Sequence, residues 1–446
     1  MRSAEEPGQL RIAVLAETHT RGGAERQGYL MAQELHNMGH HVTVLSIFPP
    51  PFTSTRHKGL SAEFSDLPTD HALPALAHLP RWAYSKIRRL SKRKVQSTPD
   101  GTQPTSSQAE SKKPQPGPLP RFLAKVLLGR DQSNIAGLLS GLMHFHLPSG
   151  IEVRFLMRLL RRSRCDLLIS FLPKHNTIGI LASLGIGIPV IISERNDYVH
   201  QPVSQSAQWA RSVLYPHADI ITANTEFAVN QLKEAFPGKK VLWLPNRLSF
   251  PTDVSADKRT TDDIYVISRL EPQKRIGSII EALPLLHKMG LYPRILIFGE
   301  GSEEENLQAL VTSKALDAHV TFNGYVPSHE IWGKVRHGGI FVTNSSYEGS
   351  SNSLHEAVAA GLFPIVSDTV EEVFSIVRPD TAKHIVFDGS PEGIAKTLDE
   401  VLRNKEARSE IFGDLAEDFQ RYRNWSEENR NQAIGAFLKI IGKCRD

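Results

Sequence analysis

The chain has 446 residues, of which 40% are hydrophobic and 22% are charged. This length exceeds one ordinary core and predicts two or more folded domains, and the composition excludes a chain that is disordered throughout. The formal net charge of +4 is too small a surplus to indicate nucleic-acid binding, so no nucleic-acid partner is expected.

The positive charge is concentrated in two stretches. Seven basic residues and no acidic residue lie between Arg81 and Lys94, and five arginines lie between Arg154 and Arg164. Aromatic and aliphatic residues interrupt the first stretch, as in basic amphipathic segments that bind anionic membrane surfaces. A solvated helix face would show the same pattern, and both interpretations stay open.

Cysteine usage and hydropathy indicate the compartment. Cys165 and Cys444 form no paired motif, so neither a disulfide framework nor a zinc ribbon is expected. Residues 1–11 contain no apolar run of a secretory signal. The longest uncharged stretch, 178–192, is short for a membrane span and is interrupted by glycine and proline. We expect a cytoplasmic protein without a transmembrane helix, peripheral at the membrane if the basic stretches bind lipid.

Strand and helix patterns alternate along the first half of the chain. An apolar run at 12–16, a Gly22-Gly23 turn, a helical pattern at 24–38 and a strand at 41–45 predict a strand–helix–strand unit. Later strands are expected at 166–170, 189–192, 219–223 and 241–245, with helices at 177–184, 204–215 and 225–235. Residues 97–120 are rich in Pro, Ser, Thr and Gln, which predicts a disordered insertion.

A second series follows a polar linker that ends near Asp263. Strands are expected at 264–268, 294–298, 319–322, 339–343 and 363–367, and helices at 276–288, 302–313, 329–336, 353–360, 370–377, 392–403, 405–421 and 425–441. The alternation predicts an α/β fold with two Rossmann-like, doubly wound domains, 1–250 and 251–424, and a C-terminal segment, 425–446, that packs back on the first domain. Ligands of such folds bind at the carboxyl ends of the strands, so the two domains would share a cleft.

The most informative stretch for chemistry follows the predicted strand at 339–343. Small residues at 349–353 allow the backbone to approach a ligand, and the N–H groups of the following helix start suit a diphosphate. Glu348 and Glu356 can both face this pocket and accept hydrogen bonds from sugar hydroxyls. Ser353 and Glu356 also match a capping box, which would make Glu356 structural.

Two further stretches offer positive groups to the same cleft. Arg269 and Lys274 follow the first strand of the second domain, where they could neutralise a departing diphosphate. Gly22 and Gly23 could present backbone N–H groups to an anion from the opposite wall. The alternative for Arg269 and Lys274 is that they are solvated loop charges. The alternative for Gly22 and Gly23 is an ordinary tight turn.

Several motifs are absent from the sequence. It contains no D-x-D motif and no histidine cluster with the spacing of metal ligands, so we expect no metal and no other cofactor. It also lacks the G-x-G-x-x-G fingerprint and the G-x-S-x-G elbow, which disfavours hydride transfer and serine hydrolysis.

Taken together, the three stretches resemble the retaining family-4 glycosyltransferases of GT-B fold. Members of that family carry a Gly-Gly turn after the first strand, an Arg…Lys pair after the linker, and two glutamates separated by seven residues. Gly22-Gly23, Arg269…Lys274 and Glu348…Glu356 match these features, and the resemblance covers nearly the whole chain outside roughly 50–150.

The resemblance implies roles for the matching residues. Arg269 and Lys274 would hold the donor diphosphate, and these two together with Glu348 are the catalytic candidates. Glu348 would bind the transferred sugar, and Glu356 the ribose. The remaining donor-side candidates are Gly22 and Gly23 at the phosphate or reacting centre, Tyr325 and Val326 at the nucleobase, and Ser350, Ser351, Asn352 and Ser353 at the sugar and phosphates.

The sequence departs from the family pattern in two places. Ser350-Ser351 stands where an aromatic residue and a proline are frequent, which affects the expected shape of the pocket. A histidine is frequent after the strand at 189–192, where this chain has Arg195 and Asn196, as in branches that build surface polysaccharides and lipid-linked oligosaccharides. These two residues are acceptor-side candidates, with an ion pair within the loop as the alternative. His175 and Asn176 are placed on the acceptor side as a second polar strand end.

The resulting hypothesis is a metal-independent retaining glycosyltransferase of polysaccharide biosynthesis. It would transfer a hexose or N-acetylhexosamine from a nucleotide diphosphate sugar, UDP-linked by expectation, to a glycan or lipid-linked saccharide. A GT-B sugar-nucleotide epimerase and a non-catalytic sugar-nucleotide-binding protein are the alternatives.

Overall fold

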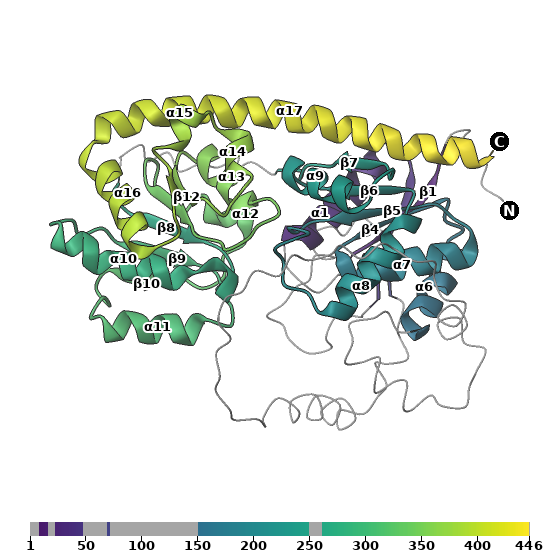
Figure 1. The fold of residues 1–446 in the computed structure, drawn as a ribbon, viewed down its shortest axis with the longest axis horizontal. Helices are drawn as coiled ribbons and strands as arrows, with labels where there is room; N and C mark the ends of the chain where they lie inside the picture. Colours follow the sequence, from purple (N-terminus) through teal and green to yellow (C-terminus); the bar gives the residue numbers. More distant parts are fainter. Residues whose placement is uncertain (1–8, 17–22, 48–68, 72–149, 249–260, 446) are drawn as a thin grey trace, which may run out of the picture.

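The computed structural model describes residues 9–16, 23–47, 69–71, 150–248 and 261–445. The basic stretch at 81–94, the insertion predicted at 97–120 and Gly22 lie outside these residues. The described chain forms two α/β halves, each built around one parallel sheet, with a long C-terminal helix running across both (Figure 1).

The first sheet, as far as the structure describes it, has seven parallel strands in the order β3-β2-β1-β4-β5-β6-β7. The strands are β1 (Arg11–Leu15), β2 (His41–Ser46), β3 (Thr69–His71), β4 (Leu167–Phe171), β5 (Val190–Glu194), β6 (Ile220–Ala223) and β7 (Val241–Trp243). Only β3 was not expected from the sequence. The central strands are apolar and buried on both faces, as parallel strands are when helices cover both sides of the sheet.

Helices cover both faces of this sheet. Around it lie α1 (Gly23–Asn37), α6 (Gly150–Arg162), α7 (Pro173–Ile186), α8 (Gln205–Leu214), the short 3-10 helix η2 (Tyr215–His217) and α9 (Glu226–Ala235). Buried residues of α6 to α9 form one core with alternate strand residues such as Leu168. Residues of α1 form a second core with the opposite strand faces, for example Ile169.

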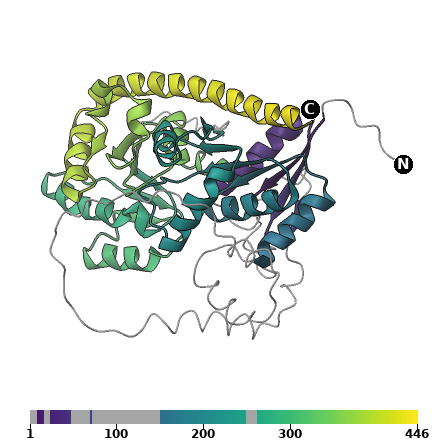
Figure 2. The ribbon, with the colours of Figure 1, turned by 45° about the vertical axis from the view of Figure 1, so that its right-hand side comes forward.

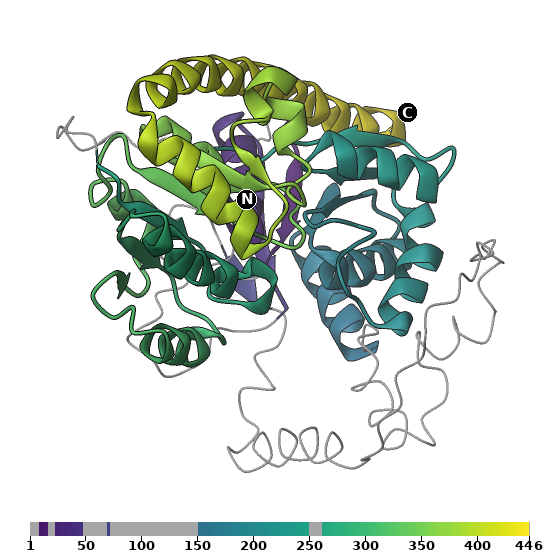
Figure 3. The ribbon, with the colours of Figure 1, turned by 60° about the vertical axis from the view of Figure 1, so that its left-hand side comes forward.

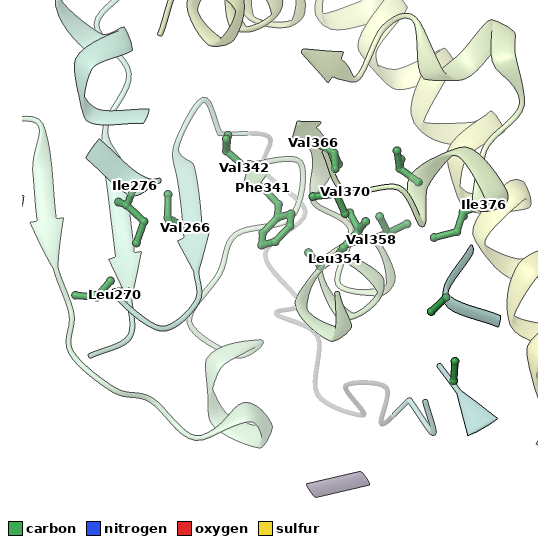
Figure 4. Packing of buried hydrophobic residues seen from close by; sticks show 14 of the residues in the cluster. Val266, Leu270, Ile276, Phe341, Val342, Leu354, Val358, Val366, Val370 and Ile376 are labelled. Carbon is green, nitrogen blue, oxygen red and sulfur yellow. The ribbon is translucent and has the colours of Figure 1, made fainter. Parts of the chain in front are cut away.

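The second sheet has six parallel strands among the described residues, in the order β10-β9-β8-β11-β12-β13. Its strands are β8 (Ile264–Ile267), β9 (Ile295–Phe298), β10 (Val320–Phe322), β11 (Ile340–Thr343), β12 (Phe363–Ser367) and β13 (Val386–Phe387). Its helices are η3 (Pro272–Lys274), α10 (Ile276–Lys288), α11 (Glu304–Ser313), α12 (Ser328–Ile331), α13 (Asn352–Ala359), α14 (Val373–Ile376), α15 (Pro379–Ala382) and α16 (Pro391–Arg403). Figure 4 shows how Phe341 and Val366 of this sheet pack beside Leu354 and Val358 of α13.

Four expected helices differ in the structure. The helix expected at 329–336 is only the single turn of α12, and the one expected at 370–377 is reduced to α14, after which Pro379 begins the separate helix α15. The two helices expected at 405–421 and 425–441 are one helix, α17 (Lys405–Arg445).

Helix α17 connects the two halves. Figures 1 and 2 show it running past the second sheet and onto the first. Its Leu415 and Phe419 belong to the core cluster that includes the second sheet, whereas its Ile434 and Phe437 join the cluster of β1, β2 and α1. None of the described helices, α17 included, has the apolar length that a bilayer crossing requires.

Both sheets have the strand order of a Rossmann fold, counted from their own first strand. In such a sheet the order reverses beside the first strand, which places switch points between β1 and β4 and between β8 and β11. Turned views show the two halves side by side beneath α17 (Figure 3). Described residues that follow β1, β4, β8 and β11 line one shared cavity.

Candidate active site

A cavity of about 530 Å³ lies between the two halves. The first half contributes residues that follow β1, β4, β5, β6 and β7, namely Gly23, Ala24, Glu25, Arg26, Leu172, Arg195, Asn196, Gln201, Asn224 and Asn246. The second half contributes residues that follow β8, β10 and β11, namely Ser268, Arg269, Gln273, Lys274, Tyr325, Val326, Ile331, Tyr347, Glu348, Gly349, Ser350, Ser351, Asn352, Ser353 and Glu356, with Ile267 at the end of β8. The walls are therefore strand ends, where ligands of parallel sheets bind.

Lys274 and Glu348 form an ion pair at the wall of this cavity. The Lys274 Nζ atom binds the Glu348 Oε1 atom, which also accepts a hydrogen bond of 2.9 Å from the Ser345 hydroxyl. Both charged side chains are about seven-eighths buried, at 15% and 13% exposure. The two catalytic candidates from distant parts of the sequence are thus in direct contact.

The loops after β8 and β11 are tied together beneath this pair. The Ser346 N–H donates to the Gln273 carbonyl over 2.8 Å, and the Gln273 side chain donates to the Tyr347 carbonyl over 2.6 Å. Arg275 has a left-handed backbone with φ of 44°, which is costly for a residue other than glycine. Its guanidinium group donates to the Asn344 carbonyl over 2.8 Å and so joins the same two loops.

Helix α13 begins at the cavity. Its N-cap is Ser351, whose side chain makes no capping hydrogen bond, and Ser353 lies inside the helix. The capping box considered for Ser353 and Glu356 is therefore not formed. Glu356 is buried, at 8% exposure, and lines the cavity. The first N–H groups of a helix have no partner within it, so this end of α13 can receive an anion.

The two halves touch each other across the cavity. The Asn246 side-chain amide donates to the Asn352 side-chain carbonyl over 2.7 Å. Gly349 lies so close to the first half that a Cβ atom there would overlap the Arg195 carbonyl oxygen. The structure therefore has a closed arrangement of the two halves.

Arg195 is held in this contact region. It is only 3% exposed, donates to the Leu244 carbonyl over 2.9 Å and to the Asn246 side chain over 3.0 Å, and its guanidinium carbon lies 5.0 Å from the Phe171 ring centre. Burial, and then the nearby charge of Arg430, holds the pKa of Arg195 well below its ordinary value. The carboxylate partner considered for Arg195 within its own loop is not found among the described residues.

His175 and Asn176, which the sequence analysis placed on the acceptor side, are not among the residues that line this cavity. Both lie in the first turn of α7, at 3% and 0% exposure, and neither belongs to the cavity wall. Asn176 donates to the Ser193 carbonyl over 3.0 Å and to the Tyr215 hydroxyl over 3.3 Å. Asn176 therefore supports the end of β5 from behind, and the His175 Nδ1 atom lies 3.2 Å from the Phe171 carbonyl at the end of β4.

The other candidates among the described residues lie at the cavity. Gly23, Tyr325, Val326, Ser350, Ser351, Asn352, Ser353, Arg269 and Asn196 all line it. In the part of the chain that the structure describes, no group of three or more His, Cys, Asp or Glu side chains could hold a metal ion.

Sequence reasoning missed some residues of the site. Gln273, Tyr347 and Asn246 line the cavity, and Glu372 binds Ser350 and Ser351 from behind. Asn246 follows β7 after Leu244 and Pro245, a position from which its place at the cleft could have been inferred. Glu372 stands in a short acidic stretch with no motif spacing, and only the tertiary contacts reveal it.

Comparison with known proteins assigns a family to each half. A model described as "Glycosyl transferases group 1" matches residues 253–416, and one described as "Glycosyl transferase 4-like domain" matches residues 121–247. Between them the two models cover more than half of the chain.

Two curated relatives illustrate the similarity. A Campylobacter jejuni protein is 25% identical over 295 residues, covering 65% of this chain and 78% of that protein; it is named as an α-1,4-N-acetyl-D-galactosaminyltransferase acting on a diNAcBac-PP-undecaprenol-linked GalNAc disaccharide. The GtfA subunit of the UDP-N-acetylglucosamine–peptide N-acetylglucosaminyltransferase from Limosilactobacillus reuteri is 32% identical over 110 residues, covering 25% of this chain and 21% of that protein. This chain spans only 21% to 42% of the length of that subunit and several other curated relatives.

A solved structure shows the same fold. The Anabaena protein HepE, crystallised in complex with UDP and glucose, superposes with a TM-score of 0.65 at 14% sequence identity, covering 97% of this chain and 100% of that one. With one family model on each half and this shared architecture, the chain belongs to the family-4 type of glycosyltransferases and has the GT-B fold.

Proposed function

We propose that this chain is a retaining glycosyltransferase that moves a hexose or N-acetylhexosamine from a UDP-linked donor to a saccharide or lipid-linked acceptor in polysaccharide biosynthesis. The observation that carries the proposal is the contact between Lys274 and Glu348, which share one cavity wall with Arg269 and the start of α13. This wall offers positive groups for a diphosphate beside a carboxylate for sugar hydroxyls.

Each part of a nucleotide sugar has a proposed partner on this wall. Arg269, Lys274 and the first N–H groups of α13 would bind the diphosphate. Glu356 would accept hydrogen bonds from the ribose, and Glu348 from the transferred sugar. Tyr325, which is 38% exposed at the cavity, would contact the nucleobase together with Val326.

The proposed reaction takes place on one face of the donor sugar. The bond between the anomeric carbon and the diphosphate oxygen breaks, the acceptor hydroxyl oxygen bonds to the same face, and the hydroxyl proton passes to the departing diphosphate. Arg269, Lys274 and the α13 dipole stabilise the charge that develops on this leaving group. Because these groups are positive, we propose that the reaction needs no metal and no other cofactor.

The names of the relatives support the choice of substrates. The Limosilactobacillus reuteri protein is named for a UDP-linked N-acetylhexosamine donor, and the Campylobacter jejuni protein for a saccharide on a lipid diphosphate. We propose the same classes for this chain, with the acceptor bound against Arg195 and Asn196 of the first half. A lipid-linked acceptor would place the enzyme at the cytoplasmic face of a membrane.

The proposal is tested by incubating the full chain with UDP-sugars and lipid-linked or free saccharides, with and without EDTA, and following the products by NMR. We expect a new glycosidic bond with the donor's anomeric configuration in both conditions. Glu348→Ala should lower turnover by at least about a hundredfold, the usual cost of losing a group that acts in the transition state. It should leave UDP binding nearly unchanged.

Glu305→Ala is the matched control, because Glu305 is exposed on α11 and does not line the cavity. Unchanged turnover in Glu348→Ala would refute the role of that residue. Donor conversion without any acceptor would show an epimerase instead, and UDP binding without turnover on any acceptor would show a binding protein. Activity that EDTA abolishes would refute the metal-independent reaction.

A further inference from the structure

Glu372 lies directly behind the loop that carries Ser350 and Ser351. It immediately precedes α14, its side chain is only 2% exposed, and it does not line the cavity. A buried carboxylate is costly unless hydrogen-bond donors surround it. The identity of those donors shows what this carboxylate does.

Four groups from three parts of the fold surround the Glu372 carboxylate. The Ser350 hydroxyl donates to Oε1 over 2.7 Å, and the Ser351 backbone N–H donates to Oε2 over 3.0 Å. The His355 Nε2 atom of α13 lies 3.3 Å from Oε1, and the Tyr422 hydroxyl of α17 donates to the same oxygen over 3.2 Å.

The environment favours the charged form of this carboxylate. Burial alone would raise the pKa of Glu372, but the charge of His355 and the hydrogen bonds from His355, Ser350 and Ser351 bring it below its ordinary value. A charged acceptor makes stronger hydrogen bonds than a neutral one, so the loop is held firmly.

The two serines face the cavity on their other side. Ser350 and Ser351 belong to the cavity wall, and Ser351 is the N-cap of α13 without a capping hydrogen bond from its own side chain. The start of α13 is therefore not held by a cap of its own, and the Ser350 hydroxyl and the Ser351 N–H donate to the Glu372 carboxylate instead.

The same carboxylate connects the loop to α17. The Tyr422 ring stacks on the His355 ring at 5.5 Å, and Tyr422 and Trp425 both pack on Trp243 of the first half, at 5.9 and 4.4 Å. Glu372 thus lies where α13, α17 and the cavity wall formed by Ser350 and Ser351 come together.

We propose that Glu372 is a positioning residue for the donor, which sets the α13 start for the diphosphate through Ser350 and Ser351. This inference rests on the proposed function, because it assumes that the cavity takes a nucleotide sugar.

The test measures the affinity of the full chain for UDP and GDP by calorimetry, together with the melting temperature of each variant. In Glu372→Gln the amide cannot accept from both serines and carries no charge, so UDP affinity should fall about tenfold, the effect of roughly one lost hydrogen bond. Ser350→Ala removes one of the two links. The double variant should bind UDP only slightly more weakly than whichever single variant has the lower affinity. The effects of coupled residues on affinity are not additive.

Asp418→Asn is the matched control for a purely structural effect. Asp418 is a buried carboxylate on α17 that accepts from the Arg378 backbone N–H over 2.9 Å and does not contact the loop. This variant should lower the melting temperature and leave UDP affinity within about twofold of wild type. If Glu372→Gln does not fold, Tyr422→Phe, which keeps the ring and removes one donor, should weaken UDP binding by a few fold.

The outcomes distinguish a failure of the proposed function from a failure of the role of Glu372. Wild-type protein that binds neither nucleotide overturns the proposed function and with it this inference. Wild-type protein that binds UDP while Glu372→Gln binds it equally well overturns only the role of Glu372. Equal loss of affinity in Asp418→Asn, or additive effects of Glu372→Gln and Ser350→Ala, would also overturn it.

Discussion

Glu372 illustrates how a single buried charge responds to pH. Its pKa in the folded protein lies below its ordinary value of 4.5, because the charge of His355 and the surrounding hydrogen-bond donors outweigh burial. A carboxyl group with a lowered folded pKa stabilises the fold above its unfolded pKa. That stabilisation is lost as the pH falls through the folded value.

The free energy of unfolding of Glu372→Gln should therefore differ from wild type most strongly near neutral pH. Below pH 4.5 the difference should shrink, because Glu372 is protonated first in the unfolded chain and, at lower pH, in the folded protein as well. Urea unfolding curves from neutral pH down to about pH 3 measure this. Glu305→Gln, at an exposed position, should give a curve parallel to wild type, and parallel curves for Glu372→Gln would contradict the lowered pKa.

At the scale of elements, α17 is one helix where the sequence indicated two. Its buried residues form one stripe along its length but pack on different partners: Leu415, Phe419 and Tyr422 pack with the core that includes the second sheet, and Ile434 and Phe437 with the core of β1, β2 and α1. In the sequence, 405–421 and 425–441 each show a helical pattern, and the polar residues between these two segments resemble a loop. Contacts with both halves keep the helix continuous, since most helical stability in proteins comes from packing.

Arg430 is the main polar attachment of α17 to the first half. It is 4% exposed, donates to the Glu34 carboxylate over 2.6 and 2.9 Å, and donates to the Pro245 carbonyl over 2.7 Å. In Arg430→Ala, the partly buried Glu34 carboxylate and the Pro245 carbonyl lose this partner. It should lower the free energy of unfolding by about 3 kcal/mol, measured by denaturant titration.

Arg421→Ala is the control on the same helix. The Arg421 side chain is 60% exposed, and its partner Asp418 keeps a second ion pair with Arg378. This variant should cost less than about 1 kcal/mol. Equal losses for Arg421→Ala and Arg430→Ala would show that α17 does not depend on the Arg430 attachment.

At the scale of the whole molecule, the two halves approach each other closely at Gly349, which has no side chain. Gly349→Ala would place a Cβ atom against the Arg195 carbonyl oxygen and close to Asn224 Nδ2, at 2.9 Å. The Arg195 backbone cannot yield easily to this Cβ atom, so the halves should separate. We expect a larger radius of gyration in small-angle scattering and at least a tenfold loss of turnover, because an open cleft loosens the reacting geometry.

Gly413→Ala on α17 is the matched control, since no atom lies within 4 Å of the new Cβ and alanine favours a helix. It should leave both the radius of gyration and the turnover unchanged. A Gly349→Ala variant as compact and as active as wild type would show that closure does not need this close approach.

The charge distribution of the whole molecule predicts a salt-sensitive attraction to anionic lipid. On α6, Arg154, Arg158, Arg161 and Arg162 are exposed, while Glu152 is buried and pairs with Lys174 over 3.1 Å. The chain should sediment with vesicles containing anionic lipid at low salt and not at high salt. Charge reversal in Arg158→Glu/Arg161→Glu should weaken this binding, whereas Arg421→Glu should not. No sedimentation at low salt would contradict the prediction.

Much of the fold could be predicted because it follows from local patterns. Runs such as 12–16 and 264–268 are apolar on both faces, which is typical of covered parallel strands, and their alternation with helical patterns predicts two doubly wound sheets. Short elements were missed or misjudged, for example β13 with two residues and α12 with four. Elements of this length depend on their neighbours more than on their own residues.

The sequence by itself determined the fold class, the position of the cavity at the strand ends and most residues of one of its walls, because spacing along one chain brings Arg269, Lys274, Glu348 and Glu356 into one domain. Only the tertiary structure decided which of them touch, that His175 lies behind the wall, and that Glu372 anchors the loop. Those contacts join residues far apart in the sequence and depend on side-chain direction and on the closure of the two halves. No pattern in a single sequence encodes them.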